Sequence, residues 1–205
     1  GRQTVFTLLV DPQDPSRLFA GCWGSNVLAS SDAGLSWAPL HGGLETLSVH
    51  SLAICSTTPR MIYAGTVEGV YCSTDGGASW KPCSKGLPER STVFCLLHDA
   101  HRECTLYAGT TRGLYRSEDC GRSWQGGTPN ADVGTVYSCL RCGDEKETIL
   151  LGTGGGVWKG TDGDTAWEAW GLRERSVFAL LEVEAEVILA GTDDGLYRLE
   201  RYSQP

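Results

Sequence analysis

The sequence predicts an all-β protein, a β-propeller built of four-stranded antiparallel blades. Two observations carry this prediction. An eight-residue phrase, Ser-x-Asp-x-Gly-x-Ser-Trp, recurs along the 205-residue chain, and the tryptophans of its copies stand 43, 44 and 43 positions apart. Each copy also holds four short runs of β-branched and aromatic residues separated by turn residues, without a sustained helical period. A fixed period of this length is typical of repeat architectures.

The strands of each repeat can be placed in chain order. The first run begins at a valine in every copy, namely Val5, Val49, Val93, Val136 and Val177. The second run ends in a glycine and leads into a tight turn, usually Thr-x-x-Gly. The closing glycine supplies the positive φ of a short hairpin, at Gly69, Gly113, Gly156 and Gly195. A third run and the recurring phrase follow, and the Trp of the phrase begins the fourth run. The expected repeats are 4–47, 48–91, 92–134, 135–175 and 176–205.

Stacking of the repeats around an axis follows from their pattern. A single four-stranded sheet has two apolar faces, and packing sheets face to face around an axis buries both and hides most edges. The coils of a parallel β-helix are much shorter than this period, and a leucine-rich repeat has a different Leu/Asn pattern. The fifth copy is incomplete, because only eight residues follow Tyr197. We expect one propeller domain of five blades, and a fragment of a larger ring stays the alternative.

We call the recurring phrase the Ser-x-Asp turn, with copies at 30–37, 73–80 and 117–124 and a worn copy at 160–167. It resembles the Asp-box of the BNR-repeat, or sialidase-like, propellers, which also occurs in xyloglucanase-type glycosidases, the sortilin ectodomain and the photosystem II assembly-factor family. The resemblance implies turns between third and fourth strands, on the face away from active sites. An Asp there can accept hydrogen bonds from its own turn, while the Trp packs into the sheet. We therefore expect structural roles for Asp32, Asp75, Asp119, Asp162, Trp37, Trp80, Trp124 and Trp167.

Composition excludes some partners. The net charge is −8, with 17 basic and 25 acidic side chains, so the domain lacks the basic surface that nucleic acid requires. No apolar run approaches a membrane span of about 20 residues. We expect no cofactor and no metal, and the oligomeric state stays open.

Nine cysteines occupy different places in different repeats. Cys72 and Cys83 flank one hairpin and could face each other as a disulfide. Cys139-x-x-Cys142 has no second pair at zinc-site spacing. The unpatterned cysteines favour a reducing compartment such as the cytoplasm. Secretion stays open, because the first residue is not Met.

The turn between the second and third strands varies most between the repeats, and it predicts the ligand-binding face. An exposed Trp beside polar groups suits sugar stacking or a protein contact. The candidate ligand-binding residues in these turns are Trp23, Glu68, Arg112, Asp193 and Asp194.

The enzymatic alternatives lack their motifs. The resemblance to sialidases implies an arginine triad and an Arg-Ile-Pro phrase; Arg90, Arg112 and Arg175 could point inward, but the phrase is absent. Glu68 with Asp193 or Asp194 could serve a glycosidase, which needs two facing carboxylates, but the turns are too short to build a groove. We therefore predict no catalytic residues, and a non-catalytic propeller that presents a rigid rim to a protein or glycan ligand. The alternative is a carbohydrate-active protein, either a sialidase-like or xyloglucanase-like glycosidase remnant or a lectin-like sugar binder.

Overall fold

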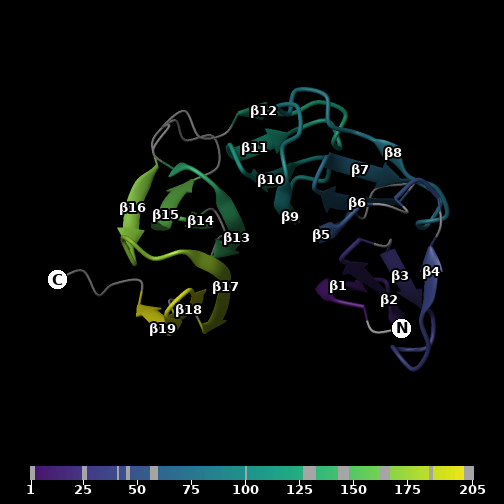
Figure 1. Cartoon of the computed structure of the whole chain (residues 1–205), viewed down its shortest axis with the longest axis horizontal. Helices are drawn as coiled ribbons and strands as arrows, with labels where there is room; N and C mark the ends of the chain where they lie inside the picture. The colour runs from purple at the N-terminus through teal and green to yellow at the C-terminus, as the bar shows by residue number, and fades with distance from the viewer. Residues whose placement is uncertain are drawn as a thin grey trace. The chain divides into compact units, whose positions relative to one another are not determined.

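A computed structural model describes residues 3–24, 27–40, 42–44, 47–55, 60–99, 101–126, 133–142, 148–161, 167–184 and 187–200. It confirms an all-β chain with the blades of a five-bladed β-propeller. Five antiparallel sheets follow one another along the sequence, and in each sheet consecutive strands are neighbours (Figure 1). Four sheets have four strands, and the fifth has three within the described residues.

Each sheet takes its strands from one continuous stretch of the chain. Sheet one contains β1 (Val5–Asp11), β2 (Asp14–Cys22), β3 (Val27–Ser30) and β4 (Ala38–Leu40). Sheet two contains β5 (Val49–Cys55), β6 (Met61–Thr66), β7 (Gly69–Ser73) and β8 (Lys81–Pro82). Sheet three contains β9 (Val93–His98), β10 (Leu106–Thr110), β11 (Gly113–Ser117) and β12 (Gln125–Gly126). Sheet four contains β13 (Val136–Cys142), β14 (Thr148–Thr153), β15 (Gly156–Thr161) and β16 (Glu168–Gly171). Sheet five contains β17 (Val177–Glu184), β18 (Val187–Thr192) and β19 (Gly195–Glu200). The five first strands begin at the five predicted valines.

The chain divides into two compact units. The first is Gly1–Ala108 with Arg116–Gln125, and the second is Gly109–Tyr115 with Gly126–Pro205. The core of the first unit holds Phe19, Leu44, Val49, Ile62 and Trp80, all at most 5% exposed. The core of the second is formed by Leu150, Val157, Val177, Ile188 and Ala190. Within the described residues, no helix is long and apolar enough to span a membrane.

The glycine one residue before the end of the second strand lets neighbouring sheets approach closely. In the first unit, a Cβ on Gly21 would lie 2.8 Å from the Val49 carbonyl oxygen at the start of the next sheet. In the second unit, a Cβ on Gly152 would lie 2.7 Å from the Val177 carbonyl oxygen. Gly191, in the last sheet of the chain, would meet only Ala179, at 3.6 Å. The repeated glycine is therefore explained by backbone contact between consecutive sheets rather than by a turn.

Each described Ser-x-Asp turn is held by its own carboxylate. Asp75 accepts hydrogen bonds from the Ser79 amide (2.9 Å), the Ser79 hydroxyl (2.5 Å) and the Ser73 hydroxyl (2.8 Å). The glycine two positions after Asp75 has φ of 94°, which a side chain rarely adopts. The Ser79 hydroxyl, followed by the Ser79 amide, lowers the pKa of Asp75 from 3.8 to about 2. The turn needs this carboxylate ionised, which supports a structural role.

The same pattern recurs in two further copies. Ser36 donates its amide and hydroxyl to Asp32, and Ser123 donates the same pair to Asp119. Hydrogen bonds led by the Ser36 hydroxyl lower the pKa of Asp32 to about 2. At Asp119 burial raises the pKa, but the hydrogen bonds from Ser123 outweigh it and the net shift is downward. The fourth Asp, Asp162, lies outside the described residues.

In the first unit, the tryptophans of the second and third Ser-x-Asp turns, Trp80 and Trp124, pack on the sheet before them. The Trp80 amide donates to the Gly42 carbonyl after sheet one, at 2.8 Å. The Trp124 amide donates to Lys85 and its indole Nε1 donates to Cys83, each at 2.8 Å, after sheet two. Trp80 and Trp124 are accordingly 5% and 3% exposed, whereas Trp37, whose sheet is the first of its unit, is 37% exposed. Trp167, in the second unit, is 5% exposed. The Ser-x-Asp turn is thus a clamp between consecutive sheets.

The cysteines correct one prediction. Cys72 and Cys83 do face each other, with a hydrogen bond between their thiols, but both are free thiols rather than the predicted disulfide. A disulfide joins Cys104 to Cys120 instead. The Cys120 amide donates to the Cys104 carbonyl at 2.9 Å, and this backbone contact brings the two Cα atoms to 4.2 Å. This pair could not be predicted from spacing, because Cys104 precedes a strand and Cys120 lies inside a Ser-x-Asp turn.

Candidate functional site

The five predicted ligand-binding residues all lie in exposed turns between second and third strands. Trp23 and Glu68 belong to the first unit, and Arg112, Asp193 and Asp194 belong to the second. The structure thus shows these residues in the turns to which the sequence assigned them. Whether they form a binding surface stays a proposal.

A threonine hydroxyl fixes the backbone of these turns. Thr66 Oγ1 donates to the Gly69 carbonyl (2.9 Å) and accepts from the Glu68 amide (3.1 Å). The same pair of bonds recurs around Thr110, Thr153 and Thr192. The turn is closed by its own groups, so side chains such as Glu68 and Arg112 are presented to solvent on a rigid backbone.

Blade one replaces this threonine turn with a different support for Trp23. The Trp23 amide donates to the Thr4 carbonyl at 2.9 Å, and the next amide, of Gly24, donates to the Ser48 hydroxyl at 3.0 Å. The Trp23 side chain is 64% exposed. Its ring centroid lies 5.7 Å from that of Phe6. An anchored backbone with an exposed ring suits Trp23 as a contact residue.

Trp23 is one end of a run of four rings, which we call the aromatic row: Trp23, Phe6, His50 and Phe94. The Phe6 and His50 centroids are 4.7 Å apart, and those of His50 and Phe94 are 5.5 Å apart. Phe6, His50 and Phe94 come from the starts of β1, β5 and β9, so the row joins three consecutive sheets of the first unit. Phe6 is 40% exposed, and one end of the row is therefore open to a ligand.

The second unit has the same arrangement on a smaller scale. Tyr137 and Phe178, from the starts of β13 and β17, have centroids 5.2 Å apart. Phe178 is 51% exposed. Apart from Trp23, each of these rings directly follows the first valine of its repeat: Phe6, His50, Phe94, Tyr137 and Phe178. That repeated position was the signal that the sequence offered, and our prediction missed it because it considered only the turns.

His50 lies within the aromatic row, and burial shapes its titration. Burial lowers the pKa of the His50 imidazole, which favours its neutral form. The rings of Phe6 and Phe94 flank it. Within the described residues, no cluster of three or more His, Cys, Asp or Glu side chains could hold a metal ion. The row offers ring faces and apolar area rather than proton transfer or metal ligation.

The two carboxylates of the turn between β18 and β19, Asp193 and Asp194, have hydrogen-bond and ion-pair partners. Arg175 Nη2 lies 2.9 Å from Asp194 Oδ2, and the Tyr197 hydroxyl donates to the same oxygen at 3.2 Å. Asp193 Oδ1 accepts from the Ser176 amide at 3.2 Å. Arg175 and Asp194 are 44% and 53% exposed, so this ion pair adds little stability. Both carboxylates of this turn therefore have hydrogen-bond or ion-pair partners close by in the chain.

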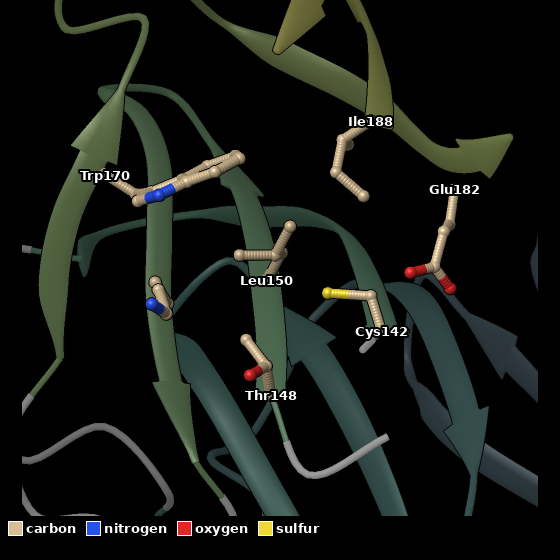
Figure 2. Close-up of a pocket in the computed structure, with 7 residues that line it drawn as sticks. Cys142, Thr148, Leu150, Trp170, Glu182 and Ile188 are labelled. Carbon is tan, nitrogen blue, oxygen red and sulfur yellow. The ribbon is translucent and has the colours of Figure 1, made fainter. Parts of the chain in front are cut away.

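A pocket opens in the second unit between sheets four and five (Figure 2). It encloses about 240 Å³, part of it open solvent. Apolar and sulfur-bearing side chains line it together with two opposite charges: Cys142, Thr148, Leu150, Lys159, Trp170, Glu182 and Ile188. Glu182 is the single carboxylate of the described lining. A glycosidase requires two carboxylates across its cleft, so this pocket does not supply that pair.

Comparisons with known proteins identify the fold. No family model and no curated protein matches the chain. Among solved structures, an ancestral GH74 enzyme superposes with a TM-score of 0.77 at 20% identity, covering 92% of this chain and 27% of that one. The GH74 xyloglucanase from Xanthomonas campestris gives 0.74 at 20% identity, covering 98% and 37%. YCF48 bound to D1 peptide gives 0.70 at 16% identity, covering 97% and 66%. The chain thus spans between a quarter and two-fifths of the length of these GH74 enzymes, and the similarity shows the propeller fold alone.

Proposed function

We propose that this chain is a single, non-catalytic β-propeller domain that binds a protein segment along its aromatic row. The carrying observation is the row itself: four rings from three sheets, with Trp23 64% exposed at its end. Aromatic rings on rigid strands supply contact area at small entropic cost, which is the usual character of an interface anchor. Glu68, which lies in an exposed turn of the same unit, would tune partner choice and approach.

Two further observations support a binding role. The Ser-x-Asp turns act as clamps between sheets, as Asp-boxes of the BNR type would, and this leaves the opposite end of the sheets for a ligand. The structural neighbour YCF48 was solved with a D1 peptide, which shows that a related fold can accept a peptide. Candidate contact residues in the first unit are Trp23, Phe6 and Glu68, and in the second unit Arg112, Asp193 and Asp194.

A glycan is the second candidate ligand. An exposed Trp beside Phe6 is the kind of platform on which sugar rings stack. Two GH74 enzymes are among the structural neighbours, so a carbohydrate-active ancestor fits the fold. Hydrolysis is the least supported version, because Asp193 and Asp194 are engaged by neighbouring groups and the described pocket offers one carboxylate.

The test separates these ligands. Wild type would be screened against a phage-displayed random peptide library and a β-glucan oligosaccharide array that includes xyloglucan fragments. Trp23→Ala and Phe6→Ala should each weaken binding of the selected peptide about tenfold or more, as loss of an anchor ring does. Leu35→Ala is the matched control, because Leu35 is 90% exposed on the Ser-x-Asp turn at the other end of the same sheet. Equal affinity in all three variants would remove the aromatic row as the site.

Enzymatic activity has its own measurement. Release of reducing ends from xyloglucan and of sialic acid from sialyllactose would be assayed with purified wild type and with the Asp194→Asn variant. We expect no turnover in either. Turnover in wild type that disappears in Asp194→Asn would replace the binding proposal with a glycosidase.

A further inference from the structure

Two free thiols, Cys72 and Cys83, flank the Ser-x-Asp turn of sheet two. Cys72 lies in β7, and the Cys83 amide, just after β8, donates to the Val70 carbonyl at 2.8 Å. Cys72 is paired with Lys81 across the β7–β8 ladder, so Cys83, two residues beyond Lys81, projects on the same face as Cys72. The Cys83 thiol donates a hydrogen bond to the Cys72 sulfur. The two thiols are therefore neighbours on one face of the β7–β8 ladder, and both are free rather than joined in a disulfide.

The surroundings favour reaction at Cys72. The hydrogen bond from Cys83, aided by the charge of Lys81 against an opposing effect of burial, lowers the pKa of Cys72 from 9.0 to about 7. The same hydrogen bond and burial raise the pKa of Cys83. Both side chains are partly exposed, whereas the free thiols Cys22, Cys55 and Cys142 are buried. A thiolate that a small reagent can reach, beside a second thiol, is the arrangement of a reactive cysteine pair.

The neighbourhood is rich in sulfur and already holds one disulfide. The Cys83 sulfur lies 3.8 Å from the position that a Cβ of Gly121 would take. Gly121 follows Cys120, which is joined to Cys104. Tyr63, paired with Cys72 across β6 and β7, donates its hydroxyl to the Cys120 carbonyl at 2.9 Å. The packing of blade two against the turn of blade three thus brings the dithiol beside a cystine that is stable in the folded chain.

We propose that Cys72 and Cys83 form a reversible disulfide site that is oxidised by low-molecular-weight disulfides of the glutathione type. The Cys72 thiolate attacks one sulfur of glutathione disulfide, which gives a mixed disulfide and releases one glutathione thiolate. Cys83, after losing its proton, attacks the Cys72 sulfur and expels the second glutathione. Overall, two protein thiols and one glutathione disulfide become one protein disulfide and two glutathione molecules. This site is independent of the proposed ligand binding.

The oxidised bond would brace the clamp between sheets. The chain from Cys72 to Cys83 contains the whole Ser-x-Asp turn 73–80, including Asp75 and Trp80. Closing this segment with a covalent bond restricts the unfolded chain and so raises stability. Oxidation should therefore raise the melting temperature of the protein, and reduction of the bond should reverse the change.

The test uses the intact protein and a convenient peptide. Trypsin does not cut before Pro82, so one tryptic peptide, 61–85, holds Cys72 and Cys83 and no other cysteine. The folded chain is incubated with excess glutathione disulfide, then denatured, alkylated with iodoacetamide and digested. We expect the peptide to lose both alkyl groups and to be lighter than the dithiol form by two hydrogen atoms. Cys22 and Cys142 should stay fully alkylated, as buried controls.

Single variants check the order of the steps. Cys83→Ser should stop at a Cys72–glutathione adduct, and Cys72→Ser should leave Cys83 largely alkylatable. The rise in melting temperature should appear in wild type and in neither variant. The proposal is overturned if wild type keeps both alkyl groups, if the glutathione adduct persists with Cys83 present, or if peptide 61–85 becomes linked to Cys120 instead.

Discussion

Removing the indole of Trp124 should be far more damaging than removing that of Trp37, although both occupy the same position of the repeat. Trp124 is 3% exposed and its Nε1 donates to the Cys83 carbonyl at 2.8 Å. Trp37 is 37% exposed and donates to the Gly34 carbonyl of its own turn at 3.1 Å. The two side chains therefore have the same local turn but different tertiary partners.

The magnitudes follow from burial. A Trp buries about 150–250 Å² on folding. At about 25 cal/mol per Å², and allowing for a compact unfolded chain, full burial contributes about 3–5 kcal/mol. Trp124→Ala should therefore lower the free energy of unfolding by about 3–5 kcal/mol. Besides the lost burial, the substitution leaves a cavity and an unpaired carbonyl. Trp37→Ala should cost about 2 kcal/mol or less, because solvent fills the space.

Urea unfolding followed by far-ultraviolet circular dichroism measures both costs as changes in the free energy of unfolding. Circular dichroism avoids the loss of fluorescence that any Trp substitution brings. Should Trp124→Ala fail to fold, Trp124→Phe against Trp37→Phe gives the same comparison with smaller losses. Equal costs for the two positions would refute the view that the Ser-x-Asp turn is a clamp on the preceding sheet.

Four further predictions concern stability. Asp119→Ala should lower the free energy of unfolding by about 1 kcal/mol, because the carboxylate is only partly buried, and should leave peptide binding intact. Lost binding at an unchanged melting temperature would contradict the structural role. Asp32 and Asp75 have folded pKa values of about 2 against 3.8, so their stabilisation is complete above about pH 4 and is lost as the pH falls towards 2, which acid titration of the melting temperature can follow. Gly86→Ala places a Cβ 2.1 Å from the Trp124 carbonyl oxygen at φ of 95°, and it should lower the free energy of unfolding by more than about 2 kcal/mol. Gly24→Ala, which has open space around its Cβ, should lower it by about 1 kcal/mol. Similar urea midpoints for the two variants would count against the close packing at Gly86. Arg60→Ala should lower the free energy of unfolding by about 3 kcal/mol, because it leaves the fully buried carboxylate of Asp11 without its guanidinium partner. Restoration of stability in the double variant that also carries Asp11→Asn would confirm this cause.

Much of the fold could be predicted because the same strand and turn signals recur in successive repeats. The valines that begin the first strands, the Thr-x-x-Gly turns and the Ser-x-Asp turns are local features, governed by strand propensity, positive φ and short hydrogen bonds within a few residues. In the structure, β5 begins at Val49 and β13 begins at Val136, as predicted. The carboxylate contacts of Asp75 also stay within its own turn, which is why residue type and spacing sufficed to assign them.

Contacts between side chains of different sheets could not be predicted from the sequence. The row of Trp23, Phe6, His50 and Phe94 depends on residues from three sheets meeting, and only the position after each first valine hinted at it. The contacts of His50 with the rings of Phe6 and Phe94 likewise join residues of different sheets.

The sequence by itself determined the all-β class, the five repeats, the strand order within each sheet and the chemistry of the Ser-x-Asp turns, because these depend on neighbours along the chain. The tertiary structure decided which side chains from different repeats meet. It joined Cys104 to Cys120 and left Cys72 and Cys83 as adjacent thiols. It also buried Trp80 and Trp124 while exposing Trp37. The physical reason is that burial and bond formation depend on the distance between atoms in the folded chain, and equal positions in a repeat receive unequal neighbours.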